Sequence, residues 1–566
     1  MGATMSKERR STGELPAAAR RELVAALGDR NVSDDPAFMV SYAWSTTTGG
    51  EISGGQLCQH RPIAVVLPSS TEEVQAVVKT CLRHGLKFRA HSTGTASFHQ
   101  VLQDDVVSID LRRMDKIVDL DASNQMAVIE PYVTAAQLQA EAMKVGLTTH
   151  IIGAGWTHSP LASATSMAGP GISGHHTGVN FRNLLAYEWV TPEGDIVRAG
   201  SLGSEAGWFA GEGPGPGFRG VIRGSAGAFG GLGVFTRIGY KLHPWHGPPS
   251  LDHRGVHPQI GVGLSDRLRV YQPVWDDWKG PMEAAYGFLN SNAPTLVVRI
   301  PPDQYGWILT ATNQEFYDRL RSGTLPEIAR NENRISWTLV AISETVQEAE
   351  WRERTIRAIV EKSGGRFLDL APGDAEVIAR NAITACYVPR TFRAGPRQIM
   401  SCVGVYDSFG LLPEMVKTAE RLMAPYLDER KTFVEGGPEE FWIWPTEGRH
   451  LWAENIIVCD NDTAKSVGDG YAFAIQTIEE NERHPIGLAA FAQGPMLGEI
   501  YAKRFNTYQW MGKVKAMFDP AGAADGMYPS GKPTPVGKLW PYLRPVFARF
   551  PGVLRWMLRM QVKSAR

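Results

Sequence analysis

Three glycine-rich segments in the first half of the chain have the residue types and spacing of a binding site for phosphate groups. The first, Ser92-Thr93-Gly94-Thr95-Ala96, directly follows a strand-like run. The second extends from Gly153 to Gly174, and the third from Gly224 to Gly233. Small residues let the backbone approach a ligand, and successive N–H groups in tight turns form concavities that hold phosphate oxygens. Together the segments predict one extended, phosphate-bearing cofactor lying across a domain.

The elements around the first segment predict how it is positioned. Pro62 to Pro68 reads as an apolar, β-branched strand. Ser70 to Glu73 is a capping box that opens a helix ending at Gly85, and residues 86–90 form the next strand. This β–α–β unit places the glycine segment at a helix-flanked sheet edge, where ligands commonly bind.

Further along the chain, the sequence pattern indicates two regions that differ in the length and arrangement of their strands and helices. Strands are expected over 105–111 and 127–130, a helix over 135–145, and a hairpin over 185–199. From about residue 270, strands (337–344, 366–370, 398–405, 451–458) alternate with helices (346–362, 411–426, 463–480). Strands separated by amphipathic helices predict a second domain, with helices packed on a sheet.

Bulk composition limits the classes of protein to consider. A length of 566 residues favours two domains with appendages, and 43% hydrophobic with 21% charged residues describes a soluble globular protein. A net charge of −1 without a general basic field argues against a nucleic-acid partner. Five cysteines in no CxxC arrangement favour reduced thiols and a cytoplasmic location. No apolar run has signal-peptide or membrane-spanning length.

In these residues the chain resembles the vanillyl-alcohol oxidase/p-cresol methylhydroxylase family of FAD enzymes. Ser92 to Ala96 is similar to the family's pyrophosphate loop, usually GGGTS, and residues 128–134 resemble its VEPGVT segment. Residues 224–236, followed by Leu242-His243-Pro244, look like its closing GSEGTLGIIT…LHP pattern. Val514 to Pro520 is similar to the IK…DP segment by which the family's chain returns to the flavin domain. An ordered set over nearly the whole chain is highly specific.

The resemblance implies an α+β fold, with a PCMH-type two-part FAD-binding domain and an α+β cap domain for the substrate. The expected boundaries are 1–250 for the FAD-binding domain, 251–509 for the cap, 510–545 for the return to the FAD domain, and 546–566 for a basic amphipathic tail. FAD is expected to bind non-covalently, because Thr95 stands where covalently linked members often carry a histidine. His91 and His99 keep a linkage open. No metal is expected, because the stretch around His243-x-x-His246 is Gly/Pro-rich and reads as a linker.

The resemblance also assigns cofactor contacts to both loops. The expected cofactor-binding residues are Ser92, Thr93, Gly94, Thr95 and Ala96 in the first segment, Gly155, Thr157, Ser163, Ser166, Gly169, Ser173 and Gly174 in the second, and Ile196. Ile196 would contact adenine through its backbone. The alternative for Ile196 is a plain core position.

Hydride transfer from a substrate C–H to flavin N5 needs a group that accepts or steers a proton. The catalytic candidates in the cap are Tyr387, Arg390, Arg393 and His450. Tyrosine and histidine exchange protons, whereas arginine clamps a carboxylate or stabilises an oxyanion. The alternative for the Tyr–Arg-rich segment is a packed interface. His175-His176 is a second acid/base candidate, and Trp442 and Trp444 could line an aromatic pocket, although most tryptophans are core residues.

The end of the chain is basic and amphipathic. Residues 532–566 carry eight Lys or Arg residues and no Asp or Glu. Phe547, Phe550, Leu554 and Leu558 recur at helical spacing, and Pro551-Gly552 predicts two short helices. Such a tail suits an anionic membrane surface or a partner groove, and equally a helix docked on its own protein. Membrane contact would place the protein on the inner face of a membrane and favour a quinone as electron acceptor.

The sequence therefore predicts an FAD-dependent oxidoreductase, an oxidase or a dehydrogenase. It would take hydride from a small alcohol, hydroxy acid or phenolic substrate to flavin N5 and pass the electrons to oxygen, a quinone or a carrier protein. Three alternatives stay open: a non-redox transferase of the alkylglycerone-phosphate synthase type, a membrane-associated flavoprotein reductase, and a non-catalytic flavin-binding protein. A homodimer is also left open.

Overall fold

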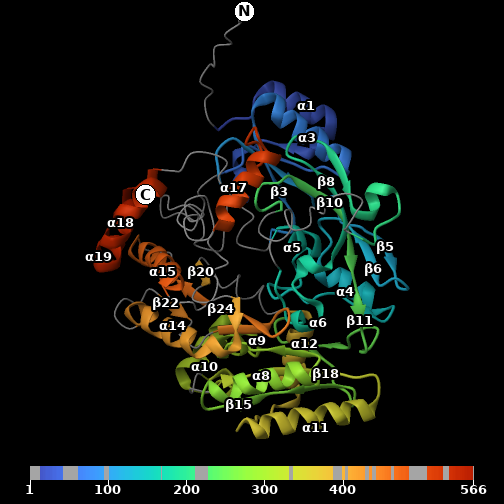
Figure 1. The fold of residues 1–566 in the computed structure, drawn as a ribbon, viewed down its shortest axis with the longest axis vertical. Helices are drawn as coiled ribbons and strands as arrows, with labels where there is room; N and C mark the ends of the chain where they lie inside the picture. The colour runs from blue at the N-terminus through green and yellow to red at the C-terminus, as the bar shows by residue number, and fades with distance from the viewer. Residues whose placement is uncertain are drawn as a thin grey trace, which may run out of the picture.

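The computed structural model describes residues 13–42, 61–94, 101–166, 169–210, 227–330, 335–385, 398–401, 406–427, 433–435, 441–459, 464–483, 506–526 and 535–564. The described elements form two halves (Figure 1). Elements of the first 245 residues, blue to teal, occupy the upper part of the view, and the green to orange elements lie below them. Helix α17 (Asn506–Phe518), near the end of the chain, returns to the upper half.

The first sheet of the upper half has the order β1-β2-β4-β3. Its strands are β1 (Val32–Ser33), β2 (Ala64–Val66), β3 (Lys87–His91) and β4 (Val106–Asp110), and β2 and β3 both run parallel to β4. Helices α1 (Ala17–Leu27) and α3 (Thr71–His84) lie together on it (Figure 1). The side chain of Ser70 accepts a hydrogen bond from the Glu73 N–H, and Gly85 ends α3 at φ +61°. The predicted helix start and β–α–β unit are confirmed, but the capping box is not reciprocal, because the Glu73 carboxylate accepts from the Ser69 N–H at 2.7 Å instead of from the Ser70 N–H.

The second sheet of the upper half is antiparallel, with the order β5-β6-β10-β8-β9. Its strands are β5 (Ile117–Asp121), β6 (Met126–Ile129), β8 (Leu184–Val190), β9 (Ile196–Ala199) and β10 (Val234–Lys241). Helices α4 (Ala135–Met143) and α5 (Pro160–Ser166) share its core, and so do Met511, Val514 and Phe518 of α17. Helix α17 thus completes the hydrophobic core of the first half. Strand β5 was missed in the sequence.

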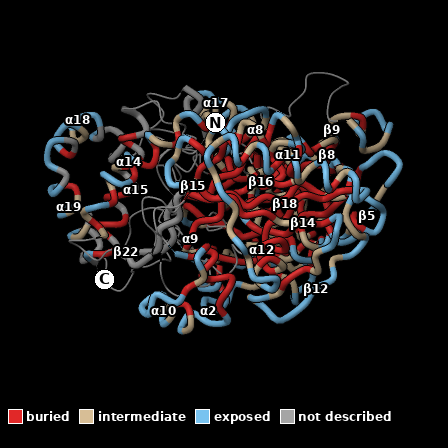
Figure 2. The backbone as a smooth tube through the Cα atoms, turned by 90° about the horizontal axis from the view of Figure 1, so that it is seen from below, coloured by how far each residue is buried: buried red, intermediate tan, exposed pale blue. Residues whose placement is uncertain are grey.

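The lower half contains a three-stranded sheet, β14-β18-β16, between two layers of helices. Its strands are β14 (Leu268–Tyr271), β16 (Leu296–Val298) and β18 (Thr338–Ile342). Alternate residues of β18 enter different cores: Val340 packs in the cluster with α9 (Pro302–Ile308) and α12 (Pro372–Thr384), and Leu339 in the cluster with α8 (Lys279–Ser291) and α11 (Val346–Lys362). Figure 2 shows the resulting block of buried residues around these strands.

A second sheet of the lower half is built around the long strand β24 (His450–Cys459). Strands β20 (Gln398–Ser401), β21 (Tyr406–Ser408), β22 (Phe433–Glu435) and β23 (Phe441–Pro445) all pair with it in the antiparallel sense. Helices α14 (Leu412–Leu427) and α15 (Ala464–Arg483) contribute Met423 and Phe473 to the core below it. Hydrogen bonds in both directions between the backbones of Arg299 and Ile443 join the two sheets.

Shorter elements connect these layers. They are α2 (Pro36–Val40), β7 (Leu147–Thr148), α6 (Gly174–Thr177), β11 (His243–Pro244), β12 (His253–Arg254), β13 (Gly261–Val262), β15 (Pro273–Trp275), α10 (Asn313–Ser322), β17 (Ile335–Ser336) and β19 (Arg366–Phe367), together with 3-10 turns at Asp29–Asn31, Asn180–Asn183, Gly200–Ser204, Glu327–Ala329 and Phe409–Leu411. The α+β architecture follows the prediction, with helix 346–362 correct at both ends.

The tail forms two helices, α18 (Pro535–Arg549) and α19 (Pro551–Ser564), which meet at Phe550. The break expected at Pro551 is confirmed. The predicted apolar stripe is divided, because Phe547 and Leu554 are buried whereas Phe550 is exposed. Within the described ranges, no helix combines the length and the apolar character needed to span a bilayer.

Candidate active site

Contacts between distant segments bring the three glycine-rich segments together. The Ser92 hydroxyl donates to the Pro131 carbonyl at 2.5 Å, which ties the first segment to the strand end before α4. The Ala136 N–H donates to the Trp156 carbonyl at 3.0 Å, which ties the second segment to the start of α4. The Ala228 N–H, in the third segment, donates to the Thr165 carbonyl at 3.1 Å. The segments therefore line one region between the two upper sheets.

The second segment is held by a buried hydrogen-bond network around His150. Its Nε2 donates to the Gly169 carbonyl at 2.9 Å, so Nδ1 is left to accept from the Thr177 hydroxyl at 2.7 Å. Burial lowers the pKa of His150 to about 3, and the ring is therefore neutral at physiological pH. The Ser173 hydroxyl accepts from the Ile151 N–H at 2.9 Å. These bonds fix the backbone path of the loop.

A buried lysine ties the third segment to the end of the chain. The ammonium of Lys515 donates to the carbonyls of Gly231 at 2.7 Å and Ala524 at 2.6 Å, and forms an ion pair with Asp519. Burial lowers the pKa of Lys515. The Asp519 carboxylate also accepts from the Ala523 N–H at 2.8 Å. Lys515 and Asp519, the Lys and Asp of the predicted return segment, therefore have a structural role.

The second segment and the residue directly after it, His175, carry buried polar groups that lack a hydrogen-bond partner within the described part of the chain. They are the Thr157 hydroxyl and both ring nitrogens of His158 and of His175. Burial lowers the pKa of His158 to about 4 and that of His175 well below its usual value, so both rings are neutral. Buried polar groups normally have partners, and a bound polar ligand can supply those that the protein does not. These groups fit the hydrogen-bonding edges of FAD.

Backbone conformation also suits a ligand at the loops. Gly94 (φ +62°), Gly155 (φ +114°) and Gly169 (φ +62°) adopt angles that residues with a side chain rarely take. At Gly94 an added Cβ would stand 2.8 Å from the His91 ring. Glycine is therefore required at these positions, and turns of this kind can present successive N–H groups to phosphates.

One face of the β23–β24 sheet lies against the second segment. Trp444 pairs with Trp452 and Trp442 with Glu454, so these four side chains share a face, which we call the aromatic face. A Cβ on Gly153 would stand 2.7 Å from the Trp444 ring, and one on Gly174 would stand 2.6 Å from the Pro445 carbonyl. The glycines of the loop thus allow the cap strand to lie directly on it.

Glu454 is the one acidic member of the aromatic face. Its carboxylate lies 3.4 Å from the Trp452 indole nitrogen. Part of the side chain stays accessible to solvent, yet burial raises the pKa of the carboxyl to about 7. A carboxyl poised near neutral pH, on the sheet face whose Trp444 meets the second segment, is suited to proton transfer. The sequence analysis missed Glu454; its place two residues after Trp452 in an alternating strand was the available signal.

An ion pair joins the turn between β23 and β24 to the 3-10 turn at Asn180–Asn183. The Arg182 guanidinium contacts both carboxylate oxygens of Glu447, at 2.6 and 3.0 Å. His450 lies in the same hairpin, exposed, with Nδ1 3.2 Å from the Glu447 carbonyl. The predicted catalytic residue His450 therefore sits at the rim of the aromatic face.

The other predicted residues have different surroundings. Tyr387, Arg390 and Arg393, and also Thr95 and Ala96, lie outside the described residues. The hydroxyls of Ser92 and Ser173 are used within the protein, and Ile196 begins β9 opposite Val190 while packing on the core of the first sheet. Thr93 lies in the first segment, whereas Ser163 and Ser166 lie in helix α5 and Gly174 begins helix α6. All these cofactor and catalytic assignments stay predictions.

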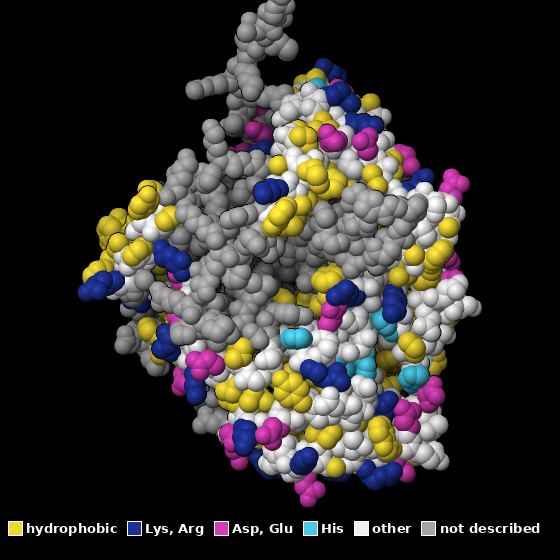
Figure 3. All heavy atoms as spheres, in the orientation of Figure 1, with side chains coloured by type: hydrophobic (Ala, Val, Ile, Leu, Met, Phe, Trp, Pro, Cys, Tyr) yellow, Lys and Arg dark blue, Asp and Glu magenta, His cyan; other side chains and the backbone are white. Residues whose placement is uncertain are grey.

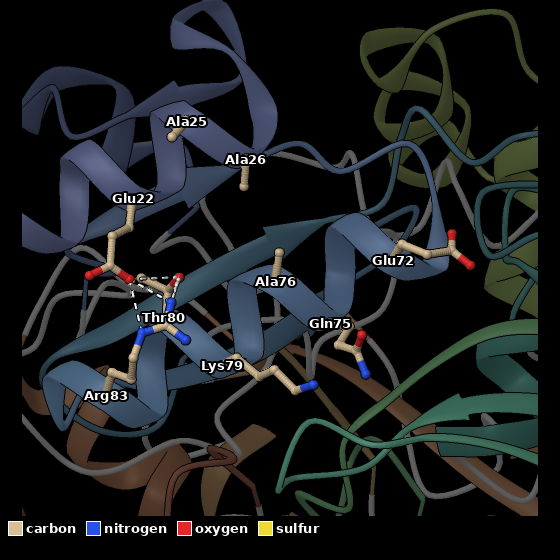
Figure 4. A pocket seen from close by; sticks show the side chains of 9 residues that line it. All are labelled: Glu22, Ala25, Ala26, Glu72, Gln75, Ala76, Lys79, Thr80 and Arg83. Carbon is tan, nitrogen blue, oxygen red and sulfur yellow. Dashed lines mark hydrogen bonds and ion pairs between the residues drawn. The ribbon is translucent and has the colours of Figure 1, made fainter.

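A surface hollow lies apart from the loops, between α1 and α3 (Figure 4). Glu22, Lys79 and Arg83 line it together with alanines. The Glu22 carboxylate is paired with Arg83 at 2.5 Å and with His84 at 2.9 Å.

The fold is that of PCMH-type FAD-binding proteins. Residues 62–200 match the family described as FAD binding domain. Among solved structures, the chain is similar to p-cresol methylhydroxylase with substrate bound (TM-score 0.67, 16% identity, covering 90% of this chain and 95% of that one) and to 4-ethylphenol oxidase from Gulosibacter chungangensis (TM-score 0.67, 16% identity, covering 91% and 97%). The predicted family resemblance, fold and FAD cofactor are confirmed.

Sequence relatives match over the cofactor region. An uncharacterized FAD-linked oxidoreductase of Mycobacterium tuberculosis is 29% identical over 34% of this chain and 39% of its own length. The flavoprotein subunit of 4-cresol dehydrogenase (hydroxylating) of Pseudomonas putida is 27% identical over 32% and 34%. The chain thus spans less than two fifths of the length of these relatives, whose names place them among FAD-dependent oxidoreductases, as predicted.

Proposed function

We propose that the chain is an oxidoreductase that removes hydride from a small phenolic or aryl-alcohol substrate held against the aromatic face. The observation that carries the proposal is that Trp444 lies directly on the second glycine segment, with Trp442 and Glu454 on the same face of the sheet. FAD, when bound, supplies an acceptor for two electrons at N5. Thr157, His158 and His175 would hold it, because their buried polar groups lack partners in the described structure.

The aromatic face would bind and orient the substrate. Trp442 and Trp444 are almost fully buried, and their rings meet edge to face at 6.2 Å between centroids. Indole rings favour a planar aromatic substrate by stacking or edge contact, and they exclude water from the reacting carbon. This arrangement supports the phenolic class among the three substrate classes that the sequence left open.

Glu454 would take the proton of the substrate hydroxyl. A carboxyl with a pKa of about 7 is substantially ionised at neutral pH and still basic enough to accept a proton. The developing phenolate or alkoxide makes loss of hydride from the neighbouring carbon easier. Tyr387, Arg390, Arg393 and His450 remain candidates for a second proton-handling or oxyanion-stabilising group.

The names of similar proteins support an aromatic substrate. Two proteins of similar fold are a p-cresol methylhydroxylase and a 4-ethylphenol oxidase. One sequence relative is the flavoprotein subunit of a 4-cresol dehydrogenase. The chain is also similar in fold to alkyldihydroxyacetonephosphate synthase, with a TM-score of 0.61 over 92% of this chain. A non-redox transferase therefore stays the second candidate.

An anaerobic titration of the flavin absorbance tests the proposal. Alkylphenols and aryl alcohols should bleach the visible band of the purified protein, whereas 2-hydroxy acids should not. Bleaching only by hydroxy acids would overturn the phenolic assignment. A band that stays unchanged with every alcohol and phenol, but bleaches with NAD(P)H, would indicate a reductase. Turnover without net bleaching would indicate the transferase.

A further inference from the structure

We propose that the outer face of the tail helices α18 and α19 docks the protein on an anionic membrane surface. This proposal is independent of the proposed reaction. It rests on how the two helices are held, on which residues they expose, and on the charge that surrounds those residues.

The inner face of the tail helices is fixed to α15. Leu554 and Phe547 are buried, and the Arg559 guanidinium donates to both oxygens of the buried Asp469, at 2.6 and 2.8 Å. The Arg544 Nε donates to Glu479 at 2.6 Å. Gly468 allows the close approach, since a Cβ there would stand 3.0 Å from the Arg559 backbone nitrogen. The tail is therefore a rigid part of the surface with a defined outer side.

The outer face is the largest accumulation of exposed apolar side chains in the described structure. Eight of the nineteen exposed large hydrophobic residues fall between positions 539 and 560: Leu539, Tyr542, Val546, Phe550, Val553, Trp556, Met557 and Met560. Val553, Trp556, Met557 and Met560 have the spacing of one helical face. Figure 3 shows apolar side chains gathered at the left edge of the molecule, where Figure 1 places these helices. Such a concentration marks an interaction site.

The charge around this face selects the partner. Residues 532–566 contain no acidic side chain, and the acidic partners of Arg544 and Arg559 lie on α15, on the inner side. Arg549 is exposed beside Phe550, with its guanidinium carbon 5.9 Å from the ring. A second copy of the chain would bring the same positive charge, which opposes self-association through this face. Anionic headgroups complement it, and tryptophan and tyrosine are enriched where membrane meets water.

The spread of the surface over two helices also fits a bilayer. The exposed residues continue across the junction at Phe550, instead of forming the single stripe that a helix inserts into a protein groove. A helix that lies in the interface buries its apolar face only at the headgroup boundary. The tail helices would bind in this manner.

Co-sedimentation of the full-length, FAD-loaded protein with vesicles tests the proposal. Vesicles of phosphatidylcholine with 30% phosphatidylglycerol, as a rough molar fraction in the range of anionic membranes, are compared with pure phosphatidylcholine. The test variant is Phe550→Ser with Trp556→Ser. The matched control is Phe209→Ser with Trp351→Ser, which are similarly exposed elsewhere. Substitutions are preferred to truncation, because removing the tail would uncover α15.

The wild-type protein and the control should bind the anionic vesicles and dissociate from them at high salt. Neither should bind the neutral vesicles. The Phe550/Trp556 variant should bind about tenfold or more weakly with unchanged flavin content, since each lost ring removes apolar area from the interface. Arg549→Gln should weaken binding roughly fivefold. Equal binding to neutral vesicles, equal binding by the test variant, or no binding by the wild type would overturn the proposal. Dimerisation that the test variant abolishes, without vesicle binding, would assign the face to a second copy.

Discussion

Arg89 and Asp525 form a buried ion pair although 436 positions separate them in the chain, with Nη1 and Oδ2 at 3.2 Å. Asp525 also accepts hydrogen bonds from the Leu102 N–H at 2.8 Å and from the Gln103 amide at 3.0 Å. Arg89 lies in β3, the strand that leads into the first glycine segment. The end of the chain therefore braces both flanks of the expected pyrophosphate loop.

Asp525→Asn should destabilise the protein and reduce its flavin content. Removing one partner of a buried pair leaves the other charge uncompensated, at a cost of about 3–5 kcal/mol in the free energy of unfolding. Denaturant titration and the FAD-to-protein ratio measure both effects. Asp29→Asn, in the exposed pair with Arg20, is the control and should change neither quantity. Equal effects at the two sites would contradict the bracing role.

Gly94→Val should yield folded protein without FAD. The residue adopts φ +62°, and an added Cβ would stand 2.8 Å from the His91 ring. Gly85→Val is the matched control, because Gly85 has φ +61° but nothing within 4 Å of its Cβ position. Both variants carry the backbone strain, and only Gly94→Val should lose the cofactor. Normal flavin content in folded Gly94→Val would show that the loop does not hold the phosphates.

Acid should unfold the protein through its buried histidines. The pKa values of His150, His158 and His243 are lowered by burial to about 3, 4 and 4, whereas an unfolded histidine titrates near 6.5. The unfolded state therefore binds more protons below pH 6.5. The free energy of unfolding should fall as pH drops from 6.5 towards 4, by up to about 1.4 kcal/mol per pH unit for each histidine. His150→Gln should reduce the pH dependence of the free energy of unfolding by the equivalent of about one proton. An unchanged pH dependence would show that His150 does not titrate on unfolding.

Glu454→Gln should lower kcat/KM by roughly 10²–10⁴-fold, the usual contribution of a proton-transfer group. In the wild type, kcat/KM should rise with pH through about 7, because the carboxylate is the active form. That rise should vanish in the variant while FAD remains bound. Glu376→Gln, at an exposed ion pair with Arg254, serves as the control. A wild-type profile that persists in Glu454→Gln would assign the proton to another group.

The flavin should be released by denaturation. Thr95 occupies the position where covalently linked family members often carry a histidine, so acid or heat should move FAD into the supernatant. Flavin that stays in the denatured pellet would show a covalent bond, and peptide mapping would then decide between His91 and His99.

The sequence alone determined the cofactor and most of the elements that carry it. Glycine spacing, the cap at Ser70 and the alternating strands are local properties, because turn conformation, capping and side-chain alternation depend on neighbouring residues. For the same reason the helix over 346–362 was predicted correctly at both ends. The break of the tail at Pro551 is likewise set by proline's own chemistry.

Only the tertiary structure decided which distant residues act together. Nothing near Asp525 in the sequence points to Arg89, and nothing near Glu454 reveals that its pairing with Trp442 places it on the sheet face whose Trp444 meets the glycine loop. The raised pKa of Glu454 and the lowered pKa of His150 arise from burial, which the whole fold creates. The tail's apolar residues could be counted in the sequence, but packing on α15 decided which of them face solvent.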